Sequence, residues 1–441
     1  MGSGKAWSTK QAMVAALCFV AAMSAGCSGN GTSAGSAGSG PKTDDATKAA
    51  AEAVTAPAAL TAAIDGIPFE DDLIAELTAN LKSKYPHITL NVIKPGKGTT
   101  LNELIVAGST PDIVFTYNGL VASYRQADLL YDITPLAKSH RIDLTRFDAS
   151  YLNDAKIASD KDELFGLPFR INFHAMYYNK ALFDKFGSPY PKDGMTWDQT
   201  FEVARKVARS DGGTQYRGLD TGSYFWMAQP LSISDIDPKT DKATVNTASW
   251  KRVFELIKSM YELPGNGKIP TSSFDQFTKQ QTLAMHLDLN IMTSLNNSGV
   301  PWDAAQYPSY PEKPNTYGNG SVHMAIVTKT SKYKDQAMQV IQALTSDPFQ
   351  LSMTRIGMLS PLKDPSFKAA VGTGRDELKN KNIQGILKSR PVPYPIASTY
   401  RSQAERVTVA KLNDFINGKI DVNTALKQAE EEINQMVAAQ K

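Results

Sequence analysis

The chain has almost no cysteine: Cys18 and Cys27 are the two in its 441 residues. Both lie near the N-terminus, so the remainder of the chain offers no partner for a disulfide and no thiol nucleophile. A fold without such cross-links must be stabilised by a large hydrophobic core, and a chain of this length can bury one.

An excess of charge of either sign is also missing. Lys and Arg number 47, and Asp and Glu number 44. Residues 1–26 hold two lysines and no acid, which leaves 45 basic residues against 44 acidic ones in the remainder. No basic tract or acidic tail interrupts this balance. Nucleic acid and anionic surfaces are therefore not expected as main partners.

Patterns typical of metal sites and catalytic sites are absent as well. None of the five histidines has another histidine three or four residues away, which excludes the usual helical zinc pattern. The acids of the segment Asp235-Ile236-Asp237 lack the later oxygen ligands of a calcium loop, and the body has no nucleophile elbow. A carboxylate pair suited to glycoside hydrolysis stays open, since the separation of such a pair is set in space. We expect no metal, no cofactor and no enzyme activity.

The N-terminus has the order of a secretory signal. Lys5 and Lys10 precede an apolar run over 12–23, and the small residues Ser24-Ala25-Gly26 lead to Cys27. This order predicts a lipoprotein signal peptide over 1–26, cleaved before Cys27, whose thiol then carries lipid. The alternative is an ordinary cleaved signal without lipid. A spanning helix is disfavoured, because it needs about 20 apolar residues.

Residues 27–57 have the composition of a tether. Segment 28–40 is almost entirely Gly, Ser, Ala, Thr and Asn, and segment 41–57 is rich in Ala with scattered charges. Such a sequence buries too little apolar surface to offset its ordering entropy. We therefore predict a lipidated Cys27 and a flexible linker over 27–57, with a reach on the order of 30 Å.

The body begins with alternating strand and helix patterns. Strand-like segments at 58–64, 88–92 and 111–115 are separated by helical periodicity over 69–81 and 101–107. This order predicts a mainly parallel sheet flanked by helices. Ligands of such sheets bind beyond the carboxyl ends of the strands, here Asp65-Gly66 and Thr116-Tyr117-Asn118.

A second alternating set follows. Thr196 is a natural N-cap for a helix through Val207, and residues 250–263 are amphipathic. Segments 283–285 and 322–327 have strand character, and helices are expected from Tyr333 onward, including 399–416 and 423–436. Trp197 and Trp250 lie on helix patterns and are expected in the core.

Several blocks of the body, in order, resemble one family. Residues 164–169 (Leu-Phe-Gly-Leu-Pro-Phe) followed by 177–183 (Tyr-Tyr-Asn-Lys-Ala-Leu-Phe) resemble the crossover block of extracellular solute-binding proteins. These are the sugar-binding subunits of ABC importers and include the maltodextrin-binding proteins. Further similar blocks, which together cover nearly all of the body, are 111–115, 129–134, 195–198, 331–344, 346–349, 357–361, 416–419 and 424–426. Block 281–285 departs from the pattern, because it lacks the Gly that often opens it.

The resemblance implies an α/β chain with the two-lobed periplasmic-binding-protein type II fold. Each lobe would be a mainly parallel sheet flanked by helices, and a hinge would join the lobes. Lobe I would comprise 58–170 plus 320–357, and lobe II would comprise 171–319 plus 358–441. The chain would cross between them near 169–173, 319–322 and 357–361.

The resemblance also implies a function. A carbohydrate, in the first place an oligosaccharide, would be captured by lobe closure and handed to an ABC permease in the membrane. The protein would act as a monomer on the outer face of the cell membrane, held there by lipid on Cys27. A lipid-anchored glycan hydrolase and a surface adhesion lipoprotein remain the alternatives.

The family's ligand contacts can be carried onto matching positions of this chain. The maltodextrin binders have an acidic residue where Asn172 stands and stack a Trp where Tyr400 stands. An ion pair is the competing interpretation for the charged positions, and core packing competes for the aromatic ones. The expected ligand-binding residues are Asp65, Gly66, Thr116, Tyr117, Asn118, Arg170, Asn172, Asp220, Tyr224, Trp226, Asp288, Asn290 and Tyr400.

Overall fold

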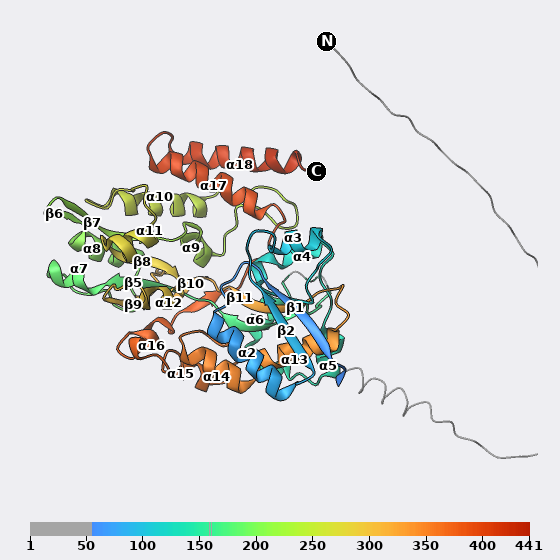
Figure 1. The fold of residues 1–441 in the computed structure, drawn as a ribbon. Coiled ribbons are helices and arrows are strands. Elements are labelled where there is room, and N and C mark those ends of the chain that lie inside the picture. Colours follow the sequence, from blue (N-terminus) through green and yellow to red (C-terminus); the bar gives the residue numbers. More distant parts are fainter. Residues whose placement is uncertain (1–54, 158, 160) are drawn as a thin grey trace, which may run out of the picture. The chain divides into compact units, whose positions relative to one another are not determined.

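A computed structural model describes residues 55–157, 159 and 161–441 of the chain. The predicted signal peptide, Cys27 and the predicted linker up to residue 54 lie outside these residues. Within the described part, two five-stranded sheets alternate with helices, which confirms the α/β class (Figure 1).

The first sheet has the strand order β2-β1-β3-β11-β4. Strand β1 pairs in parallel with both β2 and β3, as the βαβ pattern predicts. Strand β11 comes from far along the chain and runs antiparallel to both of its neighbours. The bounds of these strands are β1 Ala58–Ile64, β2 Ile88–Ile93, β3 Ile113–Tyr117, β4 Gly166–Ile171 and β11 Val322–Val327.

The second sheet has the order β6-β7-β8-β5-β9. Only β7 and β8 pair in parallel, and the other three pairings described in it are antiparallel. The prediction of a mainly parallel sheet is therefore wrong for this half of the fold. The first sheet is mixed as well, with two parallel and two antiparallel pairings. These strands span β5 His174–Asn179, β6 Arg209–Asp211, β7 Thr214–Thr221, β8 Leu283–Leu289 and β9 Trp302–Gln306.

One antiparallel pairing of the second sheet has a local cause. Gly212 and Gly213, which join β6 to β7, have φ values of 57° and 79°. A two-residue turn with positive φ at both positions matches the twist of an antiparallel hairpin. A small parallel pair, β10 (Thr316–Asn319) with β12 (Arg390–Val392), completes the strands described.

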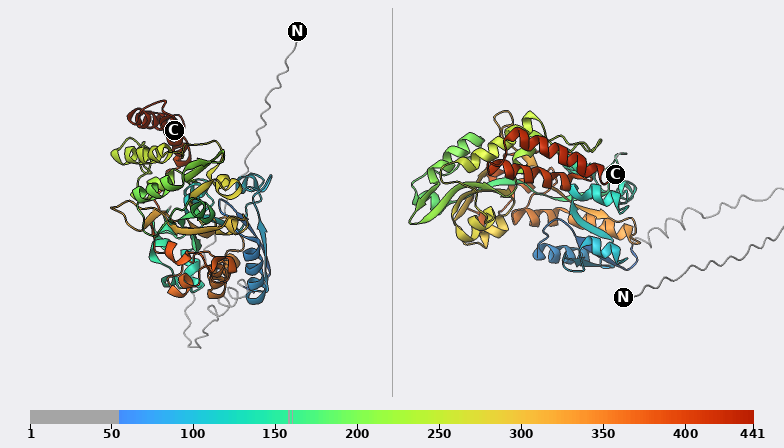
Figure 2. Two further views of the ribbon diagram at one scale, coloured as in Figure 1. Left: turned by 90° about the vertical axis from the view of Figure 1, so that its left-hand side faces the viewer. Right: turned by 90° about the horizontal axis from the view of Figure 1, so that it is seen from above.

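Helices cover both sheets. Helices α2, α13 and α14 pack together beside the first sheet, whereas α17 packs on α18 and both contact α10 (Figures 1 and 2). Thr196 caps α8 through a reciprocal capping box with Gln199, which confirms the predicted helix start. The helices named here span α2 Asp71–Lys84, α8 Trp197–Val207, α10 Ala248–Glu262, α13 Lys334–Leu344, α14 Asp347–Arg355, α17 Arg401–Ile416 and α18 Val422–Ala438.

The shorter helices fill the connections. Those that matter for the site are α9, directly after β7, and α6, which precedes β4. The shorter helices span α3 Leu101–Val106, α4 Val121–Gln126, α5 Thr134–Ser139, α6 Ala149–Ala155, α7 Lys180–Lys185, α9 Phe225–Ala228, α11 Ser273–Asp275, α12 Met292–Asn296, α15 Pro365–Ala369 and α16 Ile383–Ile386.

Buried apolar side chains form two separate clusters, one around each sheet. The chain leaves the first sheet between Ile171 and His174 and returns to it between Asn319 and Val322. The first cluster continues to Phe367 and the second resumes at Val371, about ten residues later than the predicted limit at 357. Trp197 and Trp250 lie in the second cluster, at 2% and 3% exposure, as predicted.

Among the described helices, none is long and apolar enough to span a membrane.

Candidate functional site

Side chains from both sheets surround a cavity of about 260 Å³, which we call the cleft chamber. Gly66 and Tyr117 reach it from the carboxyl ends of β1 and β3, and Trp226 reaches it from α9. This is the edge at which ligands of parallel sheets bind. The chamber is lined by Gly66, Pro68, Tyr117, Asn172, His174, Trp226, Gln229, Leu289, Asn319, Ser321, His323, Tyr394 and Arg401.

Gly66 shapes the first-sheet side of this chamber. Its φ of +71° is a conformation that other residues rarely adopt, and a Cβ here would lie 2.6 Å from Leu120 and 3.0 Å from the ring of Tyr117. Glycine therefore lets the chain turn directly after β1 while the tyrosine ring packs against it.

The polar groups of the cleft chamber are unusual because several lack partners. In the described part of the chain, His174 Nδ1, Gln229 Oε1 and both side-chain amide atoms of Asn319 are buried without a hydrogen bond. Such a group costs about 1–3 kcal/mol when it stays unpaired. A ligand rich in hydroxyl groups can donate to the amide oxygens of Gln229 and Asn319 and accept from the amide nitrogen of Asn319.

The two histidines of the chamber are neutral. Burial lowers the pKa of His174 to about 3. Burial and the neighbouring Arg170 hold the pKa of His323 well below its usual range. Arg170 Nε donates to His323 Nδ1 at 3.0 Å, so the proton of this neutral ring lies on Nε2. His323 can therefore donate from Nε2.

Aromatic surface lies beside these polar groups. The ring centroid of Trp226 lies 5.1 Å from that of His174, and Tyr317 lies 5.4 Å from the same imidazole. Burial raises the pKa of Tyr117 to about 12, so its phenol is neutral. Aromatic faces next to hydrogen-bonding groups suit the apolar faces and polar rim of a pyranose.

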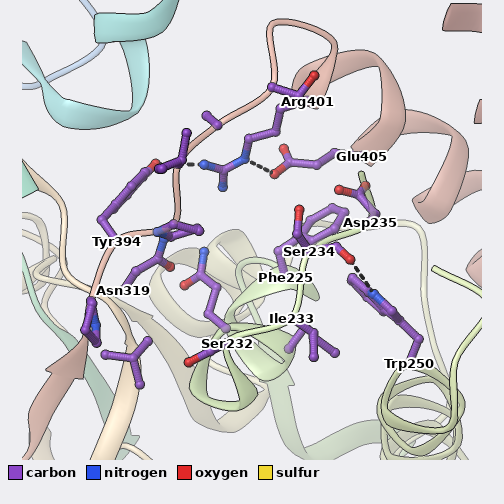
Figure 3. A pocket seen from close by; sticks show the side chains of 18 residues that line it. Phe225, Ser232, Ile233, Ser234, Asp235, Trp250, Asn319, Tyr394, Arg401 and Glu405 are labelled. Carbon is purple, nitrogen blue, oxygen red and sulfur yellow. Dashed lines mark hydrogen bonds and ion pairs between the residues drawn. The ribbon is translucent and has the colours of Figure 1, made fainter. Parts of the chain in front are cut away.

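Figure 3 shows a second cavity, of about 400 Å³, which we call the side chamber. It adjoins the cleft chamber. The two share the lining residues Gln229, Asn319, Tyr394 and Arg401. Its remaining lining residues are Phe225, Ala228, Ser232, Ile233, Ser234, Asp235, Trp250, Val392, Pro393, Pro395, Ile396, Ala397, Ser398 and Glu405.

A chain of polar contacts runs along one side of the side chamber. Arg401 donates from Nε to Glu405 Oε1 at 2.7 Å and from Nη1 to the hydroxyl of Tyr394 at 3.0 Å (Figure 3). The Trp250 indole donates to the carbonyl of Ser234 at 2.9 Å, which fixes the ring. A third cavity, of about 440 Å³, is lined by Asn118 together with residues 394–397.

Four of the predicted ligand-binding residues line the cleft chamber, namely Gly66, Tyr117, Asn172 and Trp226. Asn118 lines the third cavity, and its Oδ1 accepts from the backbone of Val322.

Three of the charged candidates are engaged with protein partners. Arg170 pairs with Glu70 at 2.7 Å, and Asp220 pairs with Arg217 at 2.7 Å. Asp288 contacts His286 Nε2 at 2.7 Å. None of the three is among the lining residues of the described cavities. The structure thus favours the ion-pair interpretation for the two pairs.

The other candidates also contact protein groups. Tyr124 donates to Asp65 at 2.5 Å, and its oxygen lies 2.8 Å from Thr116 Oγ1. The hydroxyl of Tyr224 lies 3.3 Å from that of Tyr261.

The last two candidates lie near the crossing segments. Asn290 donates to the carbonyl of Gly357 at 2.9 Å, and Tyr400 directly precedes helix α17. Neither lines the cleft chamber.

Several lining residues were not predicted: His174, Gln229, Asn319, Ser321, Tyr394 and Arg401. The sequence could have indicated three of them. His174, Asn319 and Ser321 lie where the chain crosses between the sheets, and those crossings were predicted near 169–173 and 319–322. Tyr394 stands between two prolines in an extended segment, which is a weaker indication. Among the described residues no group of three metal-ligating acids, histidines or cysteines comes together.

Known proteins share this architecture. A structure of an ABC substrate-binding protein from Listeria monocytogenes in complex with cycloalternan superposes with a TM-score of 0.71 at 16% identity. The alignment covers 86% of this chain and 99% of that one. The sugar-binding protein MalE of Xanthomonas citri gives a TM-score of 0.68 at 17% identity, over 87% of this chain and 98% of its own. These likenesses establish the fold.

Sequence comparison gives the family. A binding protein of Brucella abortus (strain 2308) is 25% identical over 204 residues, which is 43% of this chain and 49% of the relative. The chain thus spans about half the length of this curated relative. A profile of a family of substrate-binding proteins, rather than of enzymes, matches residues 73–370. The chain belongs to the bacterial extracellular solute-binding protein family.

Proposed function

We propose that this chain captures a carbohydrate, in the first place an oligosaccharide, between two lobes and delivers it to an ABC importer. The observation that carries the proposal is the set of buried, unpaired polar groups of His174, Gln229 and Asn319 beside the aromatic ring of Trp226. Sugar hydroxyls satisfy such groups, and the aromatic ring takes the apolar sugar face.

The relatives support the same ligand class. The Listeria monocytogenes protein is described in complex with cycloalternan, and the Xanthomonas citri protein is named as a sugar-binding protein. Both share the fold of this chain, at 16% and 17% identity.

Lobe closure is the proposed mechanism of capture. The lobes predicted from the sequence are 58–170 plus 320–357 and 171–319 plus 358–441. The extent of the two hydrophobic clusters supports a third crossing at about 368–370, which would extend the first lobe to Phe367. A ligand that contacts both lobes stabilises the closed state by its differential affinity for it. The permease would bind that closed state.

The lipid on Cys27 and the linker over 27–57 remain part of the proposal. An anchored monomer at the outer face of the membrane stays at high effective concentration near its importer. Replacing Cys27 by Ala is expected to move the protein from the membrane fraction to the soluble one. Retention of the variant in the membrane would contradict anchoring through this residue.

A thermal-shift screen of glycans tests the ligand class. At a concentration near 100 times Kd, a ligand adds about 2.7 kcal/mol to the free energy of unfolding. We expect at least one neutral or substituted oligosaccharide to raise the Tm, whereas peptides and polyamines do not. A shift with peptides or polyamines alone would contradict the proposal.

The adhesion alternative predicts a different cellular outcome. If the chain serves an importer, deletion of the permease should abolish the sugar uptake that depends on this chain. If it is an adhesion protein, it should bind intact polymer, and deletion of the permease should leave uptake unchanged. Uptake of a labelled oligosaccharide in permease-deleted cells therefore separates the two.

A further inference from the structure

The side chamber differs from the cleft chamber in charge. No carboxylate lines the cleft chamber among the described residues, whereas Asp235 and Glu405 both line the side chamber. Arg401 is the one cation among the described lining residues, and it is bonded to Glu405 at 2.7 Å. The side chamber therefore holds one carboxylate more than its cations balance.

Asp235 is the carboxylate that no cation of the chamber balances. It is 3% exposed, and its Oδ2 accepts a hydrogen bond from the neutral hydroxyl of Thr408 at 3.1 Å. Within the described part of the chain Asp235 forms no ion pair, in contrast to Glu405. A buried carboxylate without a cation is costly, and an incoming cation removes that cost.

Two other features of the same cavity point to a ligand. The rings of Phe225, Trp250 and Tyr394 line it, and aromatic rings attract cations as well as sugar faces (Figure 3). Asn319, at 3% exposure, lines it with both side-chain amide atoms unpaired. The uncompensated carboxylate of Asp235 thus occurs together with a formed cavity and an unpaired buried amide.

We infer that the side chamber binds a sugar unit that carries a protonated amino group, with Asp235 as its counter-ion. This inference rests on the proposed carbohydrate function and narrows it to basic, amine-bearing saccharides. Tyr394 and the aromatic walls would hold the ring, Asn319 would bond to its hydroxyls, and the ammonium group would pair with Asp235.

The titration of Asp235 gives the inference a pH signature. Burial first, and then the nearby Glu405, raise the pKa of Asp235 to about 6, while Thr408 and Arg401 act in the opposite direction. The titratable side chains that line the chamber are Asp235, Glu405, Arg401 and Tyr394. Binding of the ammonium group needs the ionised carboxylate, so the preference for an amine should be present at pH 7 and decrease as the pH falls through 6.

The test compares sugars that differ only in the amine. Calorimetric titration of the full chain would use glucosamine against glucose, and the β-1,4-linked glucosamine dimer against cellobiose, at pH 7 and pH 5. A charged hydrogen bond predicts roughly tenfold or greater preference for the amine at pH 7. The preference should fall severalfold at pH 5.

Two variants provide the matched controls. Asp235→Asn keeps an oxygen that can accept from Thr408 but removes the charge, and it should abolish the preference. Asp237→Asn removes a charge on the same loop, outside the lining residues, and keeps an oxygen for the backbone N–H groups of Lys239 and Thr240. This second variant should retain the preference.

The outcomes separate the inference from the proposed function. Equal binding of amine and hydroxyl sugars, or no binding of either amine, would overturn the inference. A neutral oligosaccharide that still raised the Tm in the glycan screen would leave the carbohydrate function standing. If Asp235→Asn failed to fold, the dependence of the wild-type preference on pH would decide the question.

Discussion

The backbone N–H of Tyr394 donates a hydrogen bond to Oδ1 of Asp154, with an N–O distance of 3.2 Å. Asp154 belongs to α6, which packs beside the first sheet. Tyr394 precedes α17, and buried residues of that helix belong to the second hydrophobic cluster. The hydroxyl of Tyr394 also accepts from Arg401 of α17. This tyrosine therefore connects the two halves of the fold at the wall of both chambers.

The contribution of Asp154 to stability is expected to decrease as the pH rises from 4 to 7. Burial raises the pKa of Asp154 to about 6, from an ordinary value near 4. The folded state therefore binds a proton more tightly than the unfolded state. Its contribution to the free energy of unfolding is present below pH 4 and is lost as the pH rises through 6.

Replacing Asp154 by Asn tests this contribution. The amide keeps an oxygen for the N–H of Tyr394 but carries no charge, so the variant should be more stable at pH 7.5 by on the order of 1 kcal/mol. Urea unfolding at pH 5 and pH 7.5 measures the difference. A variant less stable than the wild type at pH 7.5 would show that ionised Asp154 is favoured in the fold.

Trp226 is expected to contribute to sugar binding more than to stability. Its ring is half-buried, lines the cleft chamber and lies 5.1 Å from His174. Loss of an aromatic contact at the centre of a binding site costs more than about 1 kcal/mol, so Trp226→Ala should weaken binding roughly tenfold or more.

The control for Trp226 is an aromatic residue outside the cavity. Tyr190 is 37% exposed and is not among the residues lining the described chambers. Tyr190→Ala should leave the Kd for the sugar unchanged in the same titration. Equal losses in both variants would indicate a general effect on the fold.

Gly119 provides a steric test of the wall formed by Tyr117 and Tyr394. A Cβ at position 119 would lie 2.3 Å from the ring of Tyr117 and 2.4 Å from the hydroxyl of Tyr394. Gly119→Ala must displace one of these side chains and should lower sugar affinity severalfold. Gly267→Ala, where a Cβ meets nothing within 4 Å, should have no effect on the Kd.

The sequence predicted the parts of the site that follow from strand order. Gly66 and Tyr117 directly follow strands whose apolar pattern is clear, and carboxyl ends of parallel strands meet at one edge. Asn172 and Trp226 were reached through the resemblance to solute-binding proteins. His174, Asn319 and Tyr394 were missed because their position depends on where the chain crosses between the two sheets, which a local pattern does not reveal.

The antiparallel pairing of most strands in the second sheet was not predicted, for a related reason. The pattern of alternating strands and helices is the same for a parallel and a mixed sheet when distant strands insert between neighbours. β5 enters this sheet directly after the crossover and lies between β8 and β9, so its antiparallel pairings are set by long-range packing. The Gly212-Gly213 turn was the one local signal for an antiparallel pair.

Asp220 shows why a polar residue near a strand end is ambiguous in sequence. It resembles a ligand contact by position, but its carboxylate pairs with Arg217 at 2.7 Å and accepts from Tyr261 at 2.9 Å. The Arg217 side chain is 1% exposed, so removal of its partner leaves a buried, uncompensated charge. Asp220→Ala should lower the free energy of unfolding by about 3–5 kcal/mol.

A surface pair provides the comparison for this variant. Glu202 pairs with Arg205 on α8, and its side chain is 65% exposed, so Glu202→Ala should cost at most about 0.5 kcal/mol. Urea unfolding of both variants, together with sugar titration at a temperature where both are folded, separates the two roles of Asp220. Normal stability with lost binding would mean that Asp220 contacts the ligand, as the family resemblance implies. Lost stability with little change in the Kd of the folded protein would confirm the ion pair as its role.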